Sequence, residues 1–301
     1  PELSPDGSRL IYFSERDLFS IDLYVADART GEVIKKITNT ATSAHYDSLA
    51  FLTSAGSWDP TGKRFVFPAV SKGEATLNIV DVERGRTERE ITVKGANEIV
   101  NPAWSPDGKQ IVFSGMVGGF IDLFVYDLES DTERRLTSDA YAEMDPAWSP
   151  DGKRIAFSTD RFTTNLETIK TGRLRLATMD MSTGAVTELG GFANAKNISP
   201  HWAPDGKSIY FLSDRQGITN IYRMVVDGGK TTQLTNMLTG ASGITALSPA
   251  MSYAGGRIVF SAYENDGYNI YALDTAEQLA GEASVDLPRN AAVLPPRSDP
   301  G

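Results

Sequence analysis

The chain has 301 residues, of which 41% are hydrophobic and 9% aromatic, a composition that excludes a disordered protein. Its 39 acidic residues outnumber its 29 basic residues, and the formal net charge of −10 disfavours nucleic acid and anionic membranes as partners. It has no cysteine, which excludes disulfides, thiolate metal sites and cysteine nucleophiles, and no apolar run reaches the ~18 residues of a membrane span.

The first unit of the chain begins with a turn, Ser4–Gly7, which three predicted strands follow. Proline presets φ in this turn, aspartate bonds to the nearby backbone, and glycine adopts the left-handed conformation without steric cost. The β-rich runs Leu10–Phe13 and Ile21–Val25 come next along the chain. After a glycine-containing turn, the unit closes on an apolar residue and a threonine, Ile37 and Thr38.

This unit returns five more times. Later copies have a large residue before the turn, so a fourth strand precedes it. Successive turn glycines lie 44 to 55 residues apart, close to the ~40–50 residues of a propeller blade. We therefore expect an all-β fold: a six-bladed β-propeller of four-stranded antiparallel blades around a central channel. The turns begin at Ser4, Asp59, Ser105, Ser149, Ala203 and, in a degenerate copy, Ser252.

The large residues before the turns include four tryptophans, which we expect to pack between the blades. They are Trp58, Trp104, Trp148 and Trp202. The predicted blades span approximately residues 1–40, 41–95, 96–139, 140–190, 191–236 and 237–285.

Two insertions and both chain ends depart from the repeat. Residues 41–57, which include the binding candidate His45, and residues 159–173 form loops, and such loops either bind partners or are tolerated surface excursions. The first unit has three residues before its turn, so its inner strand is expected to be truncated or supplied from elsewhere. Residues 283–287 could complete a blade and close the ring, and residues 286–301 read as a proline-rich tail or linker. Both ends suggest excision from a larger protein.

Four segments resemble the repeat of TolB-type propellers: Pro102–Ser114 and Pro146–Ser158 around the turn, and Asn220–Tyr222 and Asn269–Tyr271 in the third strand. The resemblance covers roughly residues 1–275. Similar blades occur in TolB, in the propellers of prolyl-oligopeptidase-like and tricorn-like peptidases, in oligogalacturonate lyase and in envelope proteins of unknown role. The resemblance implies a periplasmic or extracellular location and a platform for binding other proteins.

Catalytic motifs are missing from the sequence. The string closest to the Gly-x-Ser-x-Gly elbow of serine hydrolases is Gly240–Gly243, which lacks the pattern. The chain has two histidines, His45 and His201, and no glycine-rich phosphate loop. We therefore predict no catalytic residue.

One repeat position on the innermost strands is polar and precedes proline. Alignment on the turn places Asn101, Asp145, Ser199 and Ser248 there, near one mouth of the channel. These side chains either bind a cation, a peptide end or a small polar ligand, or they cap the strand and hold water. His201 lies two residues after Ser199, on the same side of the strand, and either forms a metal site with Asp145 or is a structural histidine.

A second polar position opens the third strand, where short side chains are expected to bond to the backbone of the preceding loop. A calcium-binding role is open there. The residues are Asp22, Asp122, Asn220 and Asn269.

The favoured function is a non-catalytic module that binds a protein or peptide in a bacterial cell envelope or outside the cell. We expect a monomer that requires no cofactor, with a channel cation such as calcium left open. One alternative is a metal-assisted, lyase-like carbohydrate enzyme that uses His201 and Asp145. The other is the gating propeller of a peptidase whose catalytic domain is absent.

Overall fold

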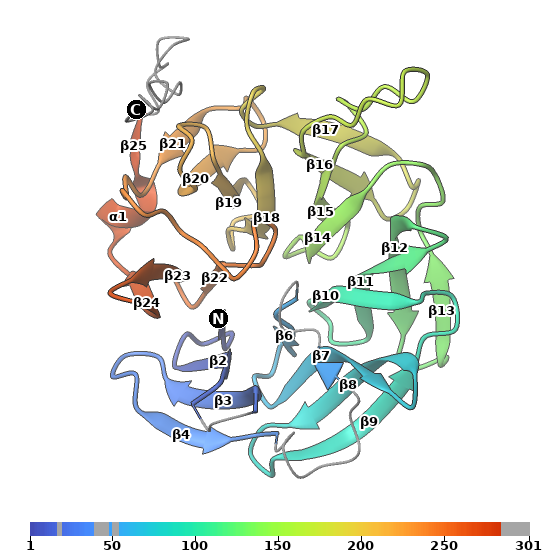
Figure 1. The fold of residues 1–301 in the computed structure, drawn as a ribbon, viewed down its shortest axis with the longest axis vertical. Coiled ribbons are helices and arrows are strands. Elements are labelled where there is room, and N and C mark those ends of the chain that lie inside the picture. The colour runs from blue at the N-terminus through green and yellow to red at the C-terminus, as the bar shows by residue number, and fades with distance from the viewer. Residues whose placement is uncertain (17–19, 39–47, 50–53, 284–301) are drawn as a thin grey trace, which may run out of the picture.

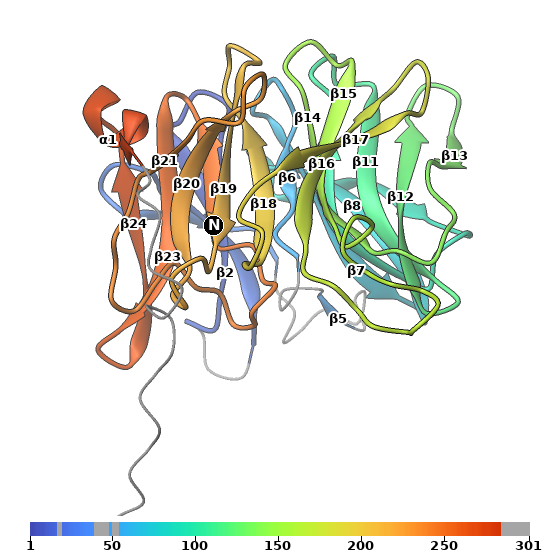
Figure 2. The ribbon, with the colours of Figure 1, turned by 90° about the horizontal axis from the view of Figure 1, so that it is seen from above.

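Six antiparallel sheets stand side by side around a central axis, which confirms the predicted six-bladed β-propeller (Figure 1). The computed structural model describes residues 1–16, 20–38, 48–49 and 54–283. Viewed from the side, the blades form a single ring one strand length deep (Figure 2). Within the described residues, no helix is long and apolar enough to cross a membrane.

Each blade runs from an inner strand at the channel to an outer strand at the rim. Blades one to three comprise β1 (Glu2–Leu3), β2 (Arg9–Ser14), β3 (Asp22–Asp27) and β4 (Val33–Lys36); β5 (Ser48–Leu49), β6 (Ser57–Trp58), β7 (Arg64–Ser71), β8 (Glu74–Asp81) and β9 (Arg86–Thr92); and β10 (Glu98–Trp104), β11 (Gln110–Val117), β12 (Phe120–Asp127) and β13 (Thr132–Arg135).

The remaining blades follow the same order in space. They comprise β14 (Glu143–Trp148), β15 (Arg154–Thr159), β16 (Arg175–Asp180) and β17 (Val186–Gly190); β18 (Asn197–Trp202), β19 (Ser208–Ser213), β20 (Asn220–Val225) and β21 (Thr231–Gln233); and β22 (Met251–Ala254), β23 (Arg257–Glu264) and β24 (Gly267–Leu273). A short helix, α1 (Ala276–Ala280), and a last strand, β25 (Glu282–Ala283), complete the described chain.

The repeated turn joins the first and second strands of a blade by the bonds that its residue types predict. In the first copy, the Gly7 amide donates to the Ser4 carbonyl at 2.7 Å. The Ser4 hydroxyl donates to Asp6 at 2.6 Å and accepts from the Arg9 amide at 2.9 Å. Gly7 has φ of +71°, which an L-residue rarely adopts. The turn is therefore a self-contained unit, and its sequence recurs because its geometry recurs.

The threonine that closes a fourth strand clamps it to the third strand. In blade three, the Thr137 hydroxyl accepts from the Leu123 amide at 2.9 Å and donates to the buried Glu143 carboxylate at 3.0 Å. Thr38 and Thr235 accept in the same way from Leu23 and Ile221. We call this arrangement the threonine clamp.

Removal of one threonine clamp tests its contribution to stability. Thr137→Val leaves the buried Leu123 amide without its acceptor, and it is expected to lower the free energy of unfolding by about 2 kcal/mol. Urea unfolding measures the loss. Thr132→Val, at an exposed site of β13, is the control; an equal loss in both variants would contradict the clamp.

The second polar repeat position is only partly as predicted. Asn220 and Asn269 donate to backbone carbonyls of the preceding segment, each at 3.4 Å. Asp22 and Asp122 instead form ion pairs with the fourth strand, through Lys36 at 2.8 Å and Arg135 at 2.5 Å. A buried aspartate needs a charged partner, and the strand next to it supplies one.

Of residues 283–287, which were predicted to complete a blade and close the ring, the structure describes only Ala283. Ala283 pairs with Thr232, so β25 extends the outer edge of blade five; residues 284–287 and the predicted tail lie outside the described residues. The seam between blades six and one is closed near the channel, where the Ser252 hydroxyl accepts from the Leu3 amide at 3.1 Å and donates to Glu2 at 2.8 Å. Blade six has three strands within the described part of the chain.

Candidate binding site in the central channel

The polar residues before proline lie at a bulge that recurs in three inner strands. Asn101, Asp145 and Ser199 have φ of 51°, 53° and 53°, and the pairing with the second strand shifts at each of them. Left-handed residues other than glycine are uncommon, and asparagine and aspartate are enriched among them. A bulge re-aims a side chain, and here the side chains line the central channel.

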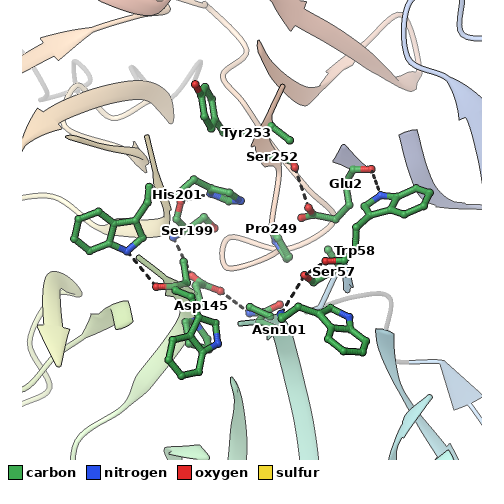
Figure 3. Close-up of a pocket in the computed structure, with 18 of the residues that line it drawn as sticks. Glu2, Ser57, Trp58, Asn101, Asp145, Ser199, His201, Pro249, Ser252 and Tyr253 are labelled. Atoms are coloured by element: carbon green, nitrogen blue, oxygen red, sulfur yellow. Dashed lines mark hydrogen bonds between the residues drawn. The ribbon is translucent and has the colours of Figure 1, made fainter. Parts of the chain in front are cut away.

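These three residues form a hydrogen-bonded chain across neighbouring blades (Figure 3). The Asn101 amide group donates to Asp145 Oδ1 at 2.5 Å, and the Ser199 backbone N–H donates to Asp145 Oδ2 at 3.0 Å. The Asn101 backbone N–H continues the chain to the Ser54 hydroxyl in blade two, at 2.8 Å. The predicted repeat position therefore links blades two to five as well as lining the channel.

Two carboxyl groups in the channel are easier to protonate than usual. Burial raises the pKa of Asp145 to about 6, although the Ser199 N–H favours the charged form. Burial also raises the pKa of Glu2 to about 7, against the stabilising hydroxyl of Ser252. No lysine or arginine is among the described residues that line this cavity. The described lining of the channel is therefore acidic, and the nearby Lys196 partly compensates Asp145.

His201 lies in the channel, as predicted, but the structure does not pair it with Asp145. Its Nδ1 is 3.0 Å from the Ser199 carbonyl, and burial lowers the pKa of the imidazole. Both Asp145 oxygens already accept bonds from Asn101 and Ser199. Within the described part of the chain, no three His, Cys, Asp or Glu side chains gather as a metal-binding group. A channel cation such as calcium stays a prediction.

Ser248 is not part of the channel. It lines a second cavity, beside Pro249, where blade six meets blade one. The cause lies in the sixth turn, which is shorter than the sequence alignment assumed: Tyr253 pairs with Ile258, whereas in blade three Trp104 pairs with Ile111. The sixth unit is thus two residues shorter, so the residue equivalent to Asn101 is Ala250 and not Ser248.

The tryptophans join neighbouring blades, as predicted. The Trp202 indole N–H donates to the Ala147 carbonyl of blade four at 3.2 Å, and the Arg154 guanidinium lies 4.8 Å from the centre of its ring. Trp58 makes the same type of bond to the Glu2 carbonyl at 3.1 Å. The channel edges of these rings still form part of the cavity wall.

The complete channel cavity has a volume of about 290 Å³ and takes residues from the inner strand of every blade. Apart from the tryptophans, sequence reasoning missed four of its polar or aromatic residues, Glu2, Ser57, Ser252 and Tyr253. Correct alignment of the sixth turn would have placed Tyr253 at the tryptophan position. His45, the candidate in the first insertion, lies outside the described residues.

Residues 46–165 and 163–284 match the family model described as the TolB beta propeller domain. The chain belongs to the TolB beta-propeller family. A curated relative of this propeller, the uncharacterized protein Atu1656 of Agrobacterium fabrum, is 33% identical over 91 residues, which cover 30% of this chain and 29% of that protein.

Solved structures share the TolB-type propeller at low sequence identity. TolB from Acinetobacter baumannii is 20% identical, with a TM-score of 0.70 over 91% of this chain and 63% of that one. Oligogalacturonate lyase from Vibrio parahaemolyticus is 14% identical, with a TM-score of 0.58 over 94% of this chain and 75% of that one. The chain spans less than two thirds of Atu1656 and of this TolB. These similarities establish the fold of this chain, and that fold occurs both in a TolB and in an oligogalacturonate lyase.

Proposed function

We propose that this TolB-type propeller is a non-catalytic module that binds a protein or peptide partner through its central channel, in the envelope of a bacterial cell or outside the cell. The family assignment and the structural similarity to TolB support this proposal. The observation that carries it is the channel cavity, where aromatic and proline rings surround the half-buried carboxyl group of Glu2 and the buried carboxyl group of Asp145.

The chemistry of the cavity favours a peptide segment with a basic side chain. A volume of about 290 Å³ lies at the lower end of the ~300–1,000 Å³ of small-ligand pockets, so a side chain or a peptide end fits. A cation in the channel would compensate the carboxyl groups, and the aromatic rings would contact its aliphatic stem. Binding is preferred to a lyase-like reaction because Asp145 and His201 are already engaged by Asn101 and Ser199.

Site-specific crosslinking in the bacterium that makes the protein tests this proposal. A photoreactive phenylalanine at Tyr253, inside the channel, is expected to capture one discrete protein. The same residue at Phe120, an exposed position at the start of β12, is the matched control and should not capture it.

Titration of the captured protein then locates its binding site. His201→Lys adds a positive charge to the channel and is expected to weaken binding about tenfold or more, because like charges meet. Phe120→Lys should bind as the wild type does. Equal crosslinking at both positions, or unchanged affinity in the folded His201→Lys variant, would contradict binding through the channel.

A further inference from the structure

Three of the four tryptophans beside the channel have an arginine of the preceding blade over their rings. In each pair the guanidinium carbon lies 4.6 to 5.0 Å from the ring centre, and the arginine is the second residue after its turn glycine. Such stacking is a cation–π interaction. The repeat therefore builds a guanidinium site between neighbouring turns. The three pairs are Arg9 with Trp58, Arg64 with Trp104, and Arg154 with Trp202.

The turn glycine of the blade that carries the tryptophan supplies a hydrogen-bond acceptor to two of these arginines. Arg9 Nη2 donates to the Gly62 carbonyl at 2.5 Å, and Arg154 Nη2 donates to the Gly206 carbonyl at 3.5 Å. The guanidinium is thus held by a ring on its face and by a carbonyl at its edge, an arrangement that its planar fork of donors allows.

The aspartate in the arginine's own turn adds a negative charge to the site. Hydrogen bonds from Ser4 and Ser8 lower the pKa of Asp6 to about 2, and the charge of Arg9 acts in the same direction. A nearby opposite charge stabilises both ions. A guanidinium site of this repeat therefore has three parts: an aromatic ring, a carbonyl and a carboxylate.

The fourth tryptophan, Trp148, lacks this arginine because the equivalent residue of blade three is Gln110. The Gln110 side-chain amide donates to Asp127 Oδ2 at 3.1 Å, toward the third strand of its own blade. Among the described residues, no cation lies over the Trp148 ring. Trp148 is partly buried, whereas the other three tryptophans are buried. A residue exchange within the described chain thus leaves this ring without its arginine.

The other two parts of the site are present between blades three and four. Gly152 corresponds to Gly62, and the two glycines have φ of 69° and 67°. Asp107 corresponds to Asp6, and each accepts from the serine hydroxyl that begins its turn, at 2.6 Å. Because the turns share their geometry, the Gly152 carbonyl and the Asp107 carboxylate lie around Trp148 as their counterparts lie around Trp58.

We propose that the Trp148 ring, the Gly152 carbonyl and the Asp107 carboxylate form a subsite for the guanidinium group of an arginine side chain. Trp148 and Pro150 also line the channel cavity, so the subsite lies at the mouth of the channel. The inference rests on the proposed function, and it narrows the preference for a basic side chain to arginine. A guanidinium stacks on an indole while it donates to a carbonyl, whereas an ammonium is a compact and strongly hydrated charge.

Two sources supply the same chemistry to this subsite. One is a separate molecule, such as the partner peptide of the proposed function. The other is this chain, whose arginines outside the described residues are Arg289 and Arg297. Binding of an added guanidinium to the wild-type chain and to a variant without these two arginines distinguishes the sources.

Titration of the 301-residue chain with acetyl-arginine amide tests the subsite. The four tryptophans give four indole N–H signals in the NMR spectrum of the ¹⁵N-labelled protein, and Trp148→Phe identifies the signal of Trp148. Acetyl-arginine amide is expected to shift this signal saturably, with a dissociation constant on the order of 1 mM. Acetyl-lysine amide should bind about fivefold more weakly. The other three signals should stay in place, because arginines of the chain already cover their rings.

Exchanges at the repeat position give matched variants. Gln110→Arg restores the arginine of the other blades, so it should abolish the response of Trp148 to the probe. Gln110→Asn retains a neutral amide and should respond as the wild type does. Arg154→Gln uncovers Trp202 and should add a second response, at the Trp202 signal.

The outcomes separate the subsite from its source and from the proposed function. A Trp148 signal that does not move in the wild type or in the Arg289→Gln/Arg297→Gln double variant would overturn the subsite, as would an unchanged response in Gln110→Arg. A response in the wild type assigns the guanidinium to a separate molecule, and a response only in the double variant assigns it to this chain. A Trp148 response with no protein captured at Tyr253 would refute the channel partner and retain the subsite.

Discussion

Replacement of Trp202 by alanine is expected to lower the free energy of unfolding by about 4 kcal/mol, within the range of large aromatic deletions in cores. The indole is buried between blades four and five, where it donates to the Ala147 carbonyl at 3.2 Å and stacks under Arg154. Its removal leaves a cavity, and it also leaves the guanidinium without its aromatic partner. Guanidinium chloride unfolding followed by far-UV circular dichroism measures the loss.

The variant Trp148→Ala provides a matched comparison in the preceding blade. Trp148 is only partly buried, and its indole N–H has no hydrogen-bond partner among the described residues. Trp148→Ala should therefore lower the free energy of unfolding by about 1 kcal/mol less than Trp202→Ala does. Trp202→Phe retains an aromatic ring, so its free energy of unfolding should lie between those of the wild type and Trp202→Ala. Equal losses at the two tryptophan positions would show that the bonds between blades contribute nothing.

The stability of the propeller is expected to fall as the pH rises from about 4 to about 6, because in that range the unfolded chain has lost the Asp145 proton that the folded chain still holds. The pKa of Asp145 is about 6 in the folded chain, against the ordinary aspartate value of 3.8. Between these two pKa values the folded state holds more protons than the unfolded state. The stability that protonated Asp145 contributes is therefore complete below pH 3.8 and lost above about pH 6. The contribution of Asp145 between pH 4.5 and 7.5 is about 2 kcal/mol.

The Asp145→Asn variant isolates this contribution, since the wild-type slope also includes Glu2 and Glu143, whose pKa values burial raises to about 7. Asparagine accepts the Ser199 N–H and cannot lose a proton, so the pH slope should flatten by about 2 kcal/mol over the same range. Glu167→Gln, at an exposed position of the insertion in blade four, should retain the wild-type slope. A slope unchanged by Asp145→Asn would contradict the assignment.

The fold was predictable because the repeated turn carries its own geometry. Local hydrogen bonds specify the turn formed by Ser4, Pro5, Asp6 and Gly7. Such bonds join residues that are close in the chain, so they can be predicted from the residue types in the sequence. The sixth turn was misaligned for the same reason. It contains no proline or aspartate, and a hairpin through Gly255 and Gly256 replaces the longer turn.

Half of the channel site was predictable, and half was not. Asn101, Asp145, Ser199 and His201 follow from their spacing to the turn. Glu2 and Ser252 meet across the seam although they lie 250 residues apart, and no spacing within one unit reports that contact. The raised pKa values are also invisible in sequence, because they arise from burial by all six inner strands.

The seam between Glu2 and Ser252 also determines how the propeller comes apart. Five of the six junctions join consecutive blades, whereas this one joins the first blade to the last. Contacts between distant segments form late in folding, after the entropy of a long loop has been lost. A cavity of about 640 Å³ lies beside this seam, so fewer packing contacts hold blades six and one together there. We therefore expect the ring to open locally between blades six and one at a lower free energy than global unfolding requires.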